Sequence, residues 1–190
     1  IGQDHKYNVM IGPDPPMWSN NITDPLSPAS YVLGNNYWFN ITWTDNGIVD
    51  TVIFEFNGIN YTPSNSGSTY YKIINDLAVD NYSYKWYAND SRDSWNSTPE
   101  MTYVVNKGVP PLVLTSSPSW QVTIGTQTTV TCYSNAQITN LTLYRNSVKL
   151  NVSGNPVSDV QTLGLGSYNY NCASEQETAN YTTGSTFNIL

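Results

Sequence analysis

The chain has 190 residues, a formal net charge of -7 at pH 7 and a sequence pI near 4.3. Nucleic-acid binding needs clustered Lys and Arg, and the 7 basic residues are spread along the chain, so we expect no nucleic-acid partner. The sequence has no polybasic patch, and no apolar run approaches the roughly twenty residues of a membrane-spanning helix. We therefore expect no direct insertion into a membrane.

The composition favours β-strands over helices. Charged residues make up only 11% of the chain, whereas Tyr alone occurs 15 times. Tyr, Thr, Val and Trp favour strands, and no long window carries apolar residues at helical spacing. A chain of this length can hold two domains of about ninety residues, each large enough to bury a core. We predict an all-β protein.

Residues 1–12 are predicted to form an N-terminal arm. The stretch 6–11 alternates in polarity, with Tyr7, Val9 and Ile11 on one face, which is the pattern of a short strand. The proline-rich stretch 12–16 then breaks this pattern, as an interdomain linker would. This strand is either a free arm or the last strand of a preceding domain.

The first full domain is predicted over residues 13–107 and has no cysteine pair. Its strands are expected at 18–23, 37–44, 51–56, 59–62, 70–74, 82–88 and 101–105. Val52, Phe54 and Phe56 alternate toward the core. Without a disulfide, Trp43 and Trp86 are expected to fill the space that a bridge would occupy.

A second proline-containing linker, 107–111, leads into the second domain, predicted over residues 108–190. Its strands are expected at 113–116, 121–124, 128–133, 138–145, 160–163, 168–173 and 185–190. Val130 and Cys132 alternate toward the core of this domain.

Cys132 and Cys172 lie 40 positions apart on the predicted strands 128–133 and 168–173. These are the strands that carry the inter-sheet disulfide of immunoglobulin-like sandwiches, and Tyr170 stands where that fold has its tyrosine corner. A bridge would stabilise the domain by about 4 kcal/mol and would indicate an oxidising compartment. The alternative is two buried free thiols. We predict two tandem immunoglobulin-like β-sandwich domains, the second with this disulfide.

Two sets of segments carry a resemblance to known repeats. The first set is PPMWSNN at 15–21, FNITWTD at 39–45 and WYANDS at 86–91 followed by Trp95-Asn96. The second set is SPSW at 117–120, TVTC at 129–132, LYRN at 143–146 and GSYNYNC at 166–172.

These segments resemble an Ig-like repeat of archaeal cell-surface proteins and its usual companion repeat, over roughly residues 13–190. The resemblance implies modules strung together in long surface or S-layer-like proteins and filaments. It identifies a type of module and no activity. The second domain departs from antibody-type domains, because Leu141 and Leu143 stand where a tryptophan is expected.

Asn-x-Ser/Thr sequences indicate covalent N-glycans and an extracellular location at the cell surface. In the stretch 39–43, Asn40 and Thr42 share one strand face and the three apolar residues share the other. Glycans at such sites would point outward; the alternative is plain polar strand surface. The predicted glycosylation sites are Asn21, Asn40, Asn60, Asn81, Asn89, Asn96, Asn140, Asn151 and Asn180.

The sequence offers no catalytic constellation, so we expect no enzyme. His5 is the only histidine, and one His with two Cys that are expected to be bridged cannot supply the three or four ligands of a zinc site. Acidic turns at 45–50 and 89–93 would offer oxygens to calcium, but they match no known calcium loop and are better explained as ordinary turns. We expect no metal and no cofactor. Five aromatic residues are expected to be partly exposed, to bind sugars or to cover domain ends: Trp38, Tyr87, Trp95, Trp120 and Tyr144.

The leading hypothesis is a structural or adhesive subunit of an extracellular assembly, such as a surface filament or an S-layer-like array. Its partners would be copies of itself or neighbouring Ig-like repeats. If the arm is free, its strand can complete a neighbour's sandwich and join subunits head to tail, with Tyr7, Val9 and Ile11 in the acceptor core. The alternative is a surface module (an adhesin) that binds a glycan or a receptor through exposed aromatic residues.

Overall fold

The computed structural model describes residues 14–190, except for the side chains of residues 151–153. These residues form two compact units, residues 14–29 with 34–105 and residues 30–33 with 106–190. The stretch 30–33 was predicted to belong to the first domain. It belongs to the second unit, where the Tyr31 ring lies 5.2 Å from that of Tyr181.

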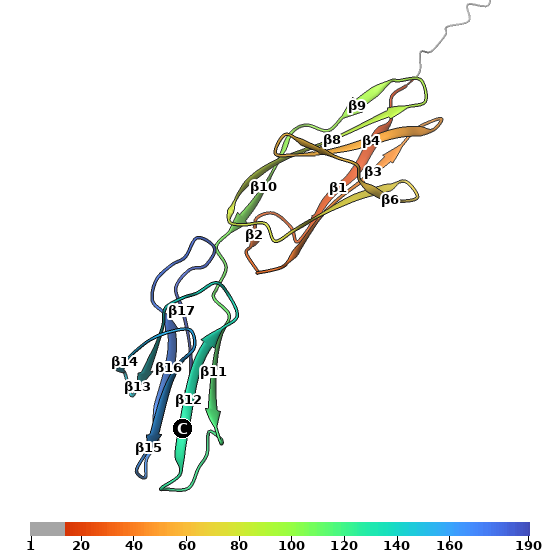
Figure 1. The fold of residues 1–190 in the computed structure, drawn as a ribbon. Coiled ribbons are helices and arrows are strands. Elements are labelled where there is room, and N and C mark those ends of the chain that lie inside the picture. The colour runs from red at the N-terminus through yellow and green to blue at the C-terminus, as the bar shows by residue number, and fades with distance from the viewer. Residues whose placement is uncertain (1–13) are drawn as a thin grey trace, which may run out of the picture. The chain divides into compact units, whose positions relative to one another are not determined.

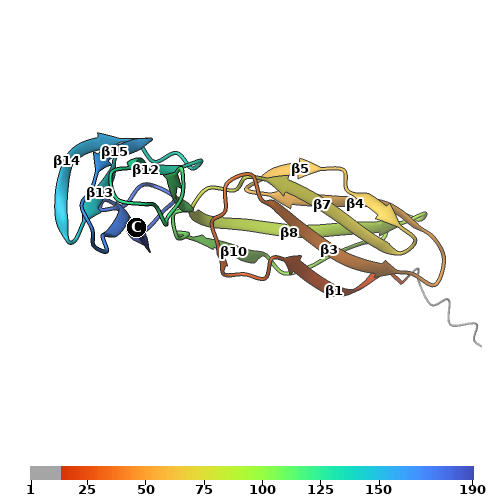
Figure 2. The same ribbon diagram turned by 90° about the horizontal axis from the view of Figure 1, so that it is seen from below.

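The first domain is a sandwich of two antiparallel sheets (Figure 1). One sheet has the strand order β1-β3-β7-β6, and the other has the order β2-β10-β8-β4-β5 with β9 paired to β8. Figure 2 shows β1, β3 and β7 side by side in one layer. The strands are β1 (Met17–Asp24), β2 (Ala29–Ser30), β3 (Asn36–Thr44), β4 (Val49–Phe56), β5 (Ile59–Tyr61), β6 (Ser64–Ser66), β7 (Thr69–Asn75), β8 (Asp80–Asp90), β9 (Trp95–Ser97) and β10 (Met101–Asn106).

The second domain repeats this arrangement. Its sheets have the orders β11-β12-β15 and β14-β13-β16-β17, which match β1-β3-β7 and β5-β4-β8-β10 of the first domain. Both domains are therefore immunoglobulin-like sandwiches. The strands are β11 (Leu112–Ser117), β12 (Gln127–Ser134), β13 (Leu141–Arg145), β14 (Val148–Gly154), β15 (Val157–Thr162), β16 (Asn169–Ser174) and β17 (Gly184–Ile189).

Phe39 of β3 connects the two sheets of the first domain. Its ring centroid lies 5.1 Å from that of Phe54 on β4 and 5.0 Å from that of Tyr84 on β8. Each such aromatic pair stabilises the fold by about 0.5–1.5 kcal/mol beyond the burial of its apolar area. Trp43 and Trp86 are buried on opposite sheets, as the predicted filling role requires.

The sheets of the second domain are joined by a disulfide between Cys132 on β12 and Cys172 on β16, with a Cα–Cα distance of 5.5 Å. Leu141 and Leu143 of β13 are fully buried, and Leu143 is in register with Cys172; they stand where antibody-type domains have a tryptophan.

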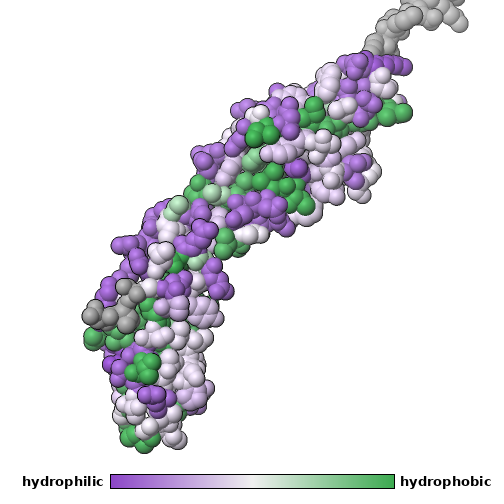
Figure 3. Space-filling view, viewed as in Figure 1, coloured by the Kyte–Doolittle hydropathy of each residue, from purple (hydrophilic) through white to green (hydrophobic). Residues whose placement is uncertain are grey.

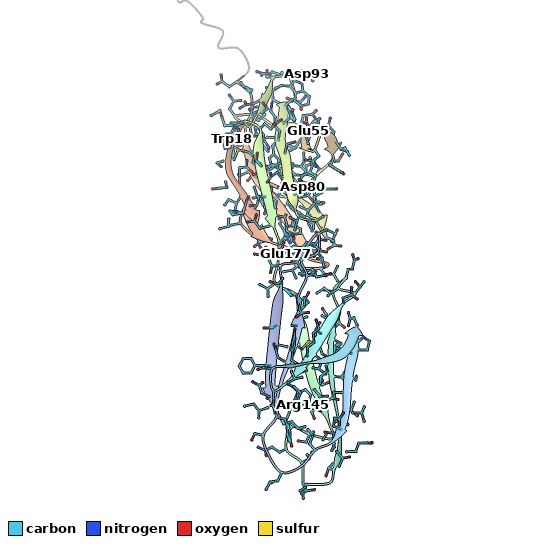
Figure 4. All side chains as sticks on the ribbon, turned by 90° about the vertical axis from the view of Figure 1, so that its left-hand side faces the viewer. Trp18, Glu55, Asp80, Asp93, Arg145 and Glu177 are labelled. Carbon is cyan, nitrogen blue, oxygen red and sulfur yellow. A yellow bond between two sulfur atoms is a disulfide. The ribbon has the colours of Figure 1, made fainter. Side chains whose placement is uncertain are left out.

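A partly buried ion pair adds a second connection between these sheets. Arg145 Nη1 on β13 lies 2.7 Å from Asp159 Oδ2 on β15, and Arg145 lies within the second domain in Figure 4. The Tyr170 hydroxyl donates to the same Asp159 oxygen at 2.7 Å, and Gln161 Nε2 donates to Oδ1 at 3.1 Å. A buried carboxylate needs such partners, because an unpaired buried charge is strongly destabilising.

The tyrosine corners differ from the prediction. Tyr170 bonds the Asp159 side chain, whereas Tyr168 OH donates to the backbone oxygen of Gly164 at 3.3 Å. In the first domain Tyr82 OH donates likewise to Ala78 O at 2.9 Å. The corner tyrosine therefore stands four residues before Cys172, since the tyrosine two residues before it points into the core.

Several predicted strands also require correction. Residues 121–124 alternate in polarity but form no strand, because Thr126 N–H bonds back to Thr123 O and Ile124 is 72% exposed. The strands β2, β6, β9 and β14 were not predicted. β14 follows a two-residue turn in which Asn146 and Ser147 have φ of 49° and 63°, a hairpin geometry usually marked by Asn-Gly. Within residues 14–190, no helix is long and apolar enough to cross a membrane.

Removal of the disulfide should destabilise the second domain selectively. In a Cys132→Ala, Cys172→Ala double variant we expect the free energy of unfolding to fall by about 4 kcal/mol, because the unfolded chain is no longer restrained. Urea unfolding followed by hydrogen-exchange mass spectrometry would show early loss of protection in β12, β13 and β16. Peptides from β3, β4 and β8 should be unaffected; an equal loss in both domains would contradict the assignment of two separate cores.

Tyr170→Phe should weaken the second domain and alter its response to alkali. Burial, followed by the hydrogen bond to Asp159, raises the pKa of Tyr170 to about 12. The stabilisation from the neutral phenol is complete below pH about 10, the ordinary pKa of tyrosine, and is lost as pH rises through about 12. Between pH about 10 and about 12, the free energy of unfolding of the second domain should therefore fall less in the variant than in the unaltered protein. The first domain, where burial raises the pKa of Tyr103 to about 12, should respond as before.

Candidate functional site

The outer face of the sheet β14-β13-β16-β17 carries a row of aromatic and amide side chains. Tyr144 on β13 is in register with Asn171 on β16, and Asn171 is in register with Phe187 on β17. The Phe187 side chain is 73% exposed. An open depression of about 380 Å³ lies along this row. Three polar residues complete its lining: Ser147, Asn169 and Ser185. This mixture of flat apolar surface and polar groups suits contact with another macromolecule.

A charged cluster fixes the position of Tyr144 on this face. Lys149 Nζ lies 2.7 Å from Glu175 Oε2, and Thr142 Oγ1 donates to the same oxygen at 3.1 Å. The Tyr144 hydroxyl donates to the other carboxylate oxygen. The hydrogen bonds from Lys149, then Tyr144 and Thr142, lower the pKa of Glu175 to about 2. Because the cluster is at the surface, it orients side chains more than it stabilises the fold.

β17 is an edge strand of the same sheet. Natural proteins commonly protect a sheet edge with charged residues or proline, and the six residues of β17 include neither. Phe187 and Ile189 are 73% and 55% exposed. The opposite edge strand, β14, carries Lys149. Of the two edges, β17 is the one suited to pairing with a further strand.

A second open cleft, of about 400 Å³, lies where the loop after β11 meets the loop before β16 and the end of β17. Trp120 and Tyr168 line it, and Ile124 and Leu165 beside them are 72% and 93% exposed. Apolar residues are visible at the lower end of this domain in Figure 3. The partial exposure predicted for Trp120 is thus observed at a cleft in the second domain.

The predicted glycosylation sites differ in accessibility. Asn60, Asn81 and Asn140 are exposed, whereas Asn21, Asn40, Asn96 and Asn180 are half-buried. The side chain of Asn151 lies outside the described part of the chain. These positions leave glycan occupancy as a prediction.

Asn89 is not suited to carry a glycan, contrary to the sequence prediction. Its side chain is 3% exposed, and its Oδ1 accepts the backbone N–H of Thr51 at 2.9 Å. Its Nδ2, the atom that would bond the sugar, donates to Asp93 Oδ1 at 3.2 Å. The sequon pattern cannot detect this burial, because it depends on the pairing of β8 with β4.

The two acidic turns use their carboxylates to bind backbone amides. Asp45 Oδ2 accepts the N–H of Gly47 at 2.7 Å. Asp90 Oδ1 accepts the N–H groups of Arg92 and Ser94, each at 2.9 Å. This is turn chemistry. Within residues 14–190, no group of three or more His, Cys, Asp or Glu side chains is arranged to hold a metal ion. The arm, with His5, Tyr7, Val9 and Ile11, lies outside the described residues.

The comparisons with known proteins give only distant similarities. No protein-family model matches the chain, and no curated protein matches it. Among solved structures, the fibronectin(III)-like modules of CbhA from Clostridium thermocellum align with 90% of this chain and 92% of theirs, at 19% identity and a TM-score of 0.36. Dimeric latent PorU from Porphyromonas gingivalis aligns with 99% of this chain, at 13% identity and a TM-score of 0.42, but the chain spans only 21% of that protein's length. These similarities assign no function, and the resemblance to archaeal surface repeats stays a prediction.

Replacement of Lys149 should raise the pKa of Glu175. In Lys149→Ala we expect the pKa to move from about 2 toward the ordinary value of 4.5, because the largest stabiliser of the carboxylate is lost. An NMR titration of the Glu175 carboxyl carbon measures this directly, and Lys149→Arg is the control that retains the charge. Since the folded pKa lies below the ordinary one, any stability from the cluster is present above pH 4.5 and is lost as pH falls toward 2. An unchanged midpoint in Lys149→Ala would contradict the contact.

Proposed function

We propose that this chain is a structural or adhesive subunit of an extracellular assembly, such as a surface filament or array. The inter-sheet disulfide suits an oxidising compartment. Two sandwiches in tandem supply rigid sheet faces and edges, which are the surfaces that modular extracellular proteins use for contact. The observation that carries the proposal furthest is the exposed, uncharged edge strand β17.

The assembly proceeds by strand addition at β17. The predicted donor is the arm strand 6–11 of another copy, whose six residues equal the length of β17. Main-chain hydrogen bonds along the edge would supply affinity, and side-chain pairs would set the register. Subunits joined in this way form a head-to-tail chain, because the donor and the acceptor lie on different parts of the protein.

The donor side chains are better placed on the outer face of the sheet than in the acceptor core. β11 already lies against β16 and β17 from the opposite sheet. Phe187 and Ile189 project from the outer face, in register with Asn171 and Asn169. An added strand that places Tyr7, Val9 and Ile11 on this face would extend the apolar surface begun by Phe187. This replaces the expectation that the three residues plug the acceptor core.

Two changes should prevent assembly without unfolding the domains. Deletion of residues 1–12 removes the donor, and Phe187→Lys places a charge on the acceptor edge, where charges oppose pairing. Electron microscopy and sedimentation velocity of the intact protein should show filaments or larger species, and each variant should reduce these to monomers. Circular dichroism should be unchanged. Val148→Lys is the matched control, because Val148 is 65% exposed on the opposite edge strand.

The outcomes separate the general proposal from its mechanism. If the protein still assembles after both the deletion and Phe187→Lys, strand addition at β17 is contradicted. The subunits would then be joined by another contact. Discrete monomers in electron micrographs of protein from its native source would contradict the assembly itself. A ligand-binding surface module would then be the better description.

A further inference from the structure

The outer face of the sheet β1-β3-β7-β6 carries an exposed apolar patch. Ile22 on β1 is 51% exposed and Trp38 on β3 is 36% exposed. The Trp38 ring centroid lies 5.6 Å from that of Tyr71 on β7, with the two planes at 37°. We call Ile22, Trp38 and Tyr71 the outer patch. Apolar residues also gather over the part of the first domain that contains β1 and β2 in Figure 3.

Asn40 lies at the centre of the outer patch. It is in register with Tyr71 on one side and with Ile22 on the other. Trp38 is two residues before it on the same face of β3, and Thr42, two residues after it, completes the glycosylation sequence. The Asn40 Nδ2 lies 3.5 Å from Ile22 O, at the limit of a hydrogen bond, so little is lost when this nitrogen is modified.

We propose that an N-linked glycan on Asn40 covers the outer patch, with its first sugar stacked on the rings of Trp38 and Tyr71. Sugar rings present apolar C–H groups on their faces and hydroxyls at their edges. They can therefore pack on an aromatic ring while their hydroxyls stay hydrated. The arrangement explains why two rings and an aliphatic side chain surround an amide that bears a glycosylation sequence.

The modification joins Asn40 Nδ2 to C1 of the first sugar. A phosphate-activated oligosaccharide is the donor: its C1–O bond breaks, the phosphate leaves with the bonding electrons, and the amide gives up one proton to solvent. The inference rests on the extracellular part of the proposed function, since N-glycans occur on secreted proteins. It does not depend on strand addition.

Asn81 offers an internal comparison in the same domain. It is exposed on β8, in register with Val104 on β10, and its sequence is completed by Ser83. The residue in register with Asn81 is Val104 and not an aromatic residue. A glycan on Asn81 should therefore contribute less to stability than one on Asn40.

The test is a double-mutant cycle on the full chain, produced in a secretory host whose N-glycans begin with N-acetylglucosamine. Thr42→Val removes the site at Asn40, and Ser83→Ala removes the site at Asn81; each is combined with Trp38→Val, which creates no new glycosylation sequence after Asn36. Glycopeptide mass spectrometry measures occupancy, and calorimetry measures the Tm of the first domain. The same variants from a host that adds no N-glycans give the effect of each substitution itself.

We expect Asn40 to be occupied and the loss of its glycan to lower the Tm by about 4–8 °C when Trp38 is present, the change that a modest stabilising contact gives in a domain of this size. In the Trp38→Val background the same loss should have no effect, and Ser83→Ala should change little in either background. An upfield shift of the N-acetyl methyl resonance of the Asn40 sugar would show the stacking directly. If Trp38→Val fails to fold, Tyr71→Thr takes its place in the cycle.

An unoccupied Asn40, or an equal Tm change with and without Trp38, would overturn the inference. Its failure is distinguishable from failure of the proposed function, because the Tm of the first domain and glycan occupancy are measured independently of filament formation. A stacked glycan on a protein that never assembles would contradict only the assembly.

Discussion

Both domains depend on the attachment of one sheet to the inner face of another. In the first domain this attachment is made by buried rings around Phe39, and in the second by the Cys132–Cys172 disulfide together with the Arg145–Asp159 ion pair. Once alternate residues of a strand are committed to the core, the residues between them must face solvent. The inward set therefore determines which side chains are displayed on the outer faces.

The two outer faces display different chemistry. The first domain places Asn40 among Trp38, Tyr71 and Ile22, whereas the second ends its sheet on β17 with Phe187 exposed. A glycan over the first face would keep a hydrophobic surface from nonspecific contact. The uncharged edge in the second domain would remain open for specific pairing. In this way one chain could prevent association on one face and promote it at one edge.

Much of the fold was predictable from two features of the sequence. Strand alternation is a local signal that both domains carry, and the cysteine pair marks two strands of the second sandwich. The long strands β3, β4, β8 and β12 were predicted nearly at their observed bounds. The errors in the predicted strands occurred where the alternation of polarity does not correspond to the pairing of strands. Residues 121–124 alternate but have no neighbouring strand to pair with, and β14 follows a turn with an unusual sequence for its geometry. The tyrosine corner was misplaced by two residues because alternation alone assigns Tyr168 and Tyr170 to the same face and does not show which of the two is buried in the core.

The sequence by itself determined the all-β class, the disulfide partners and the inward residues of most strands, because each depends on residue type and a period of two. Only the tertiary structure decided what depends on register between distant strands. It buried Asn89 against Thr51, brought Tyr71 beside Asn40, placed Asp159 between Arg145 and Tyr170, and left β17 at an edge. These pairings join segments far apart in the chain, and a shift of one residue would exchange the faces of every side chain involved.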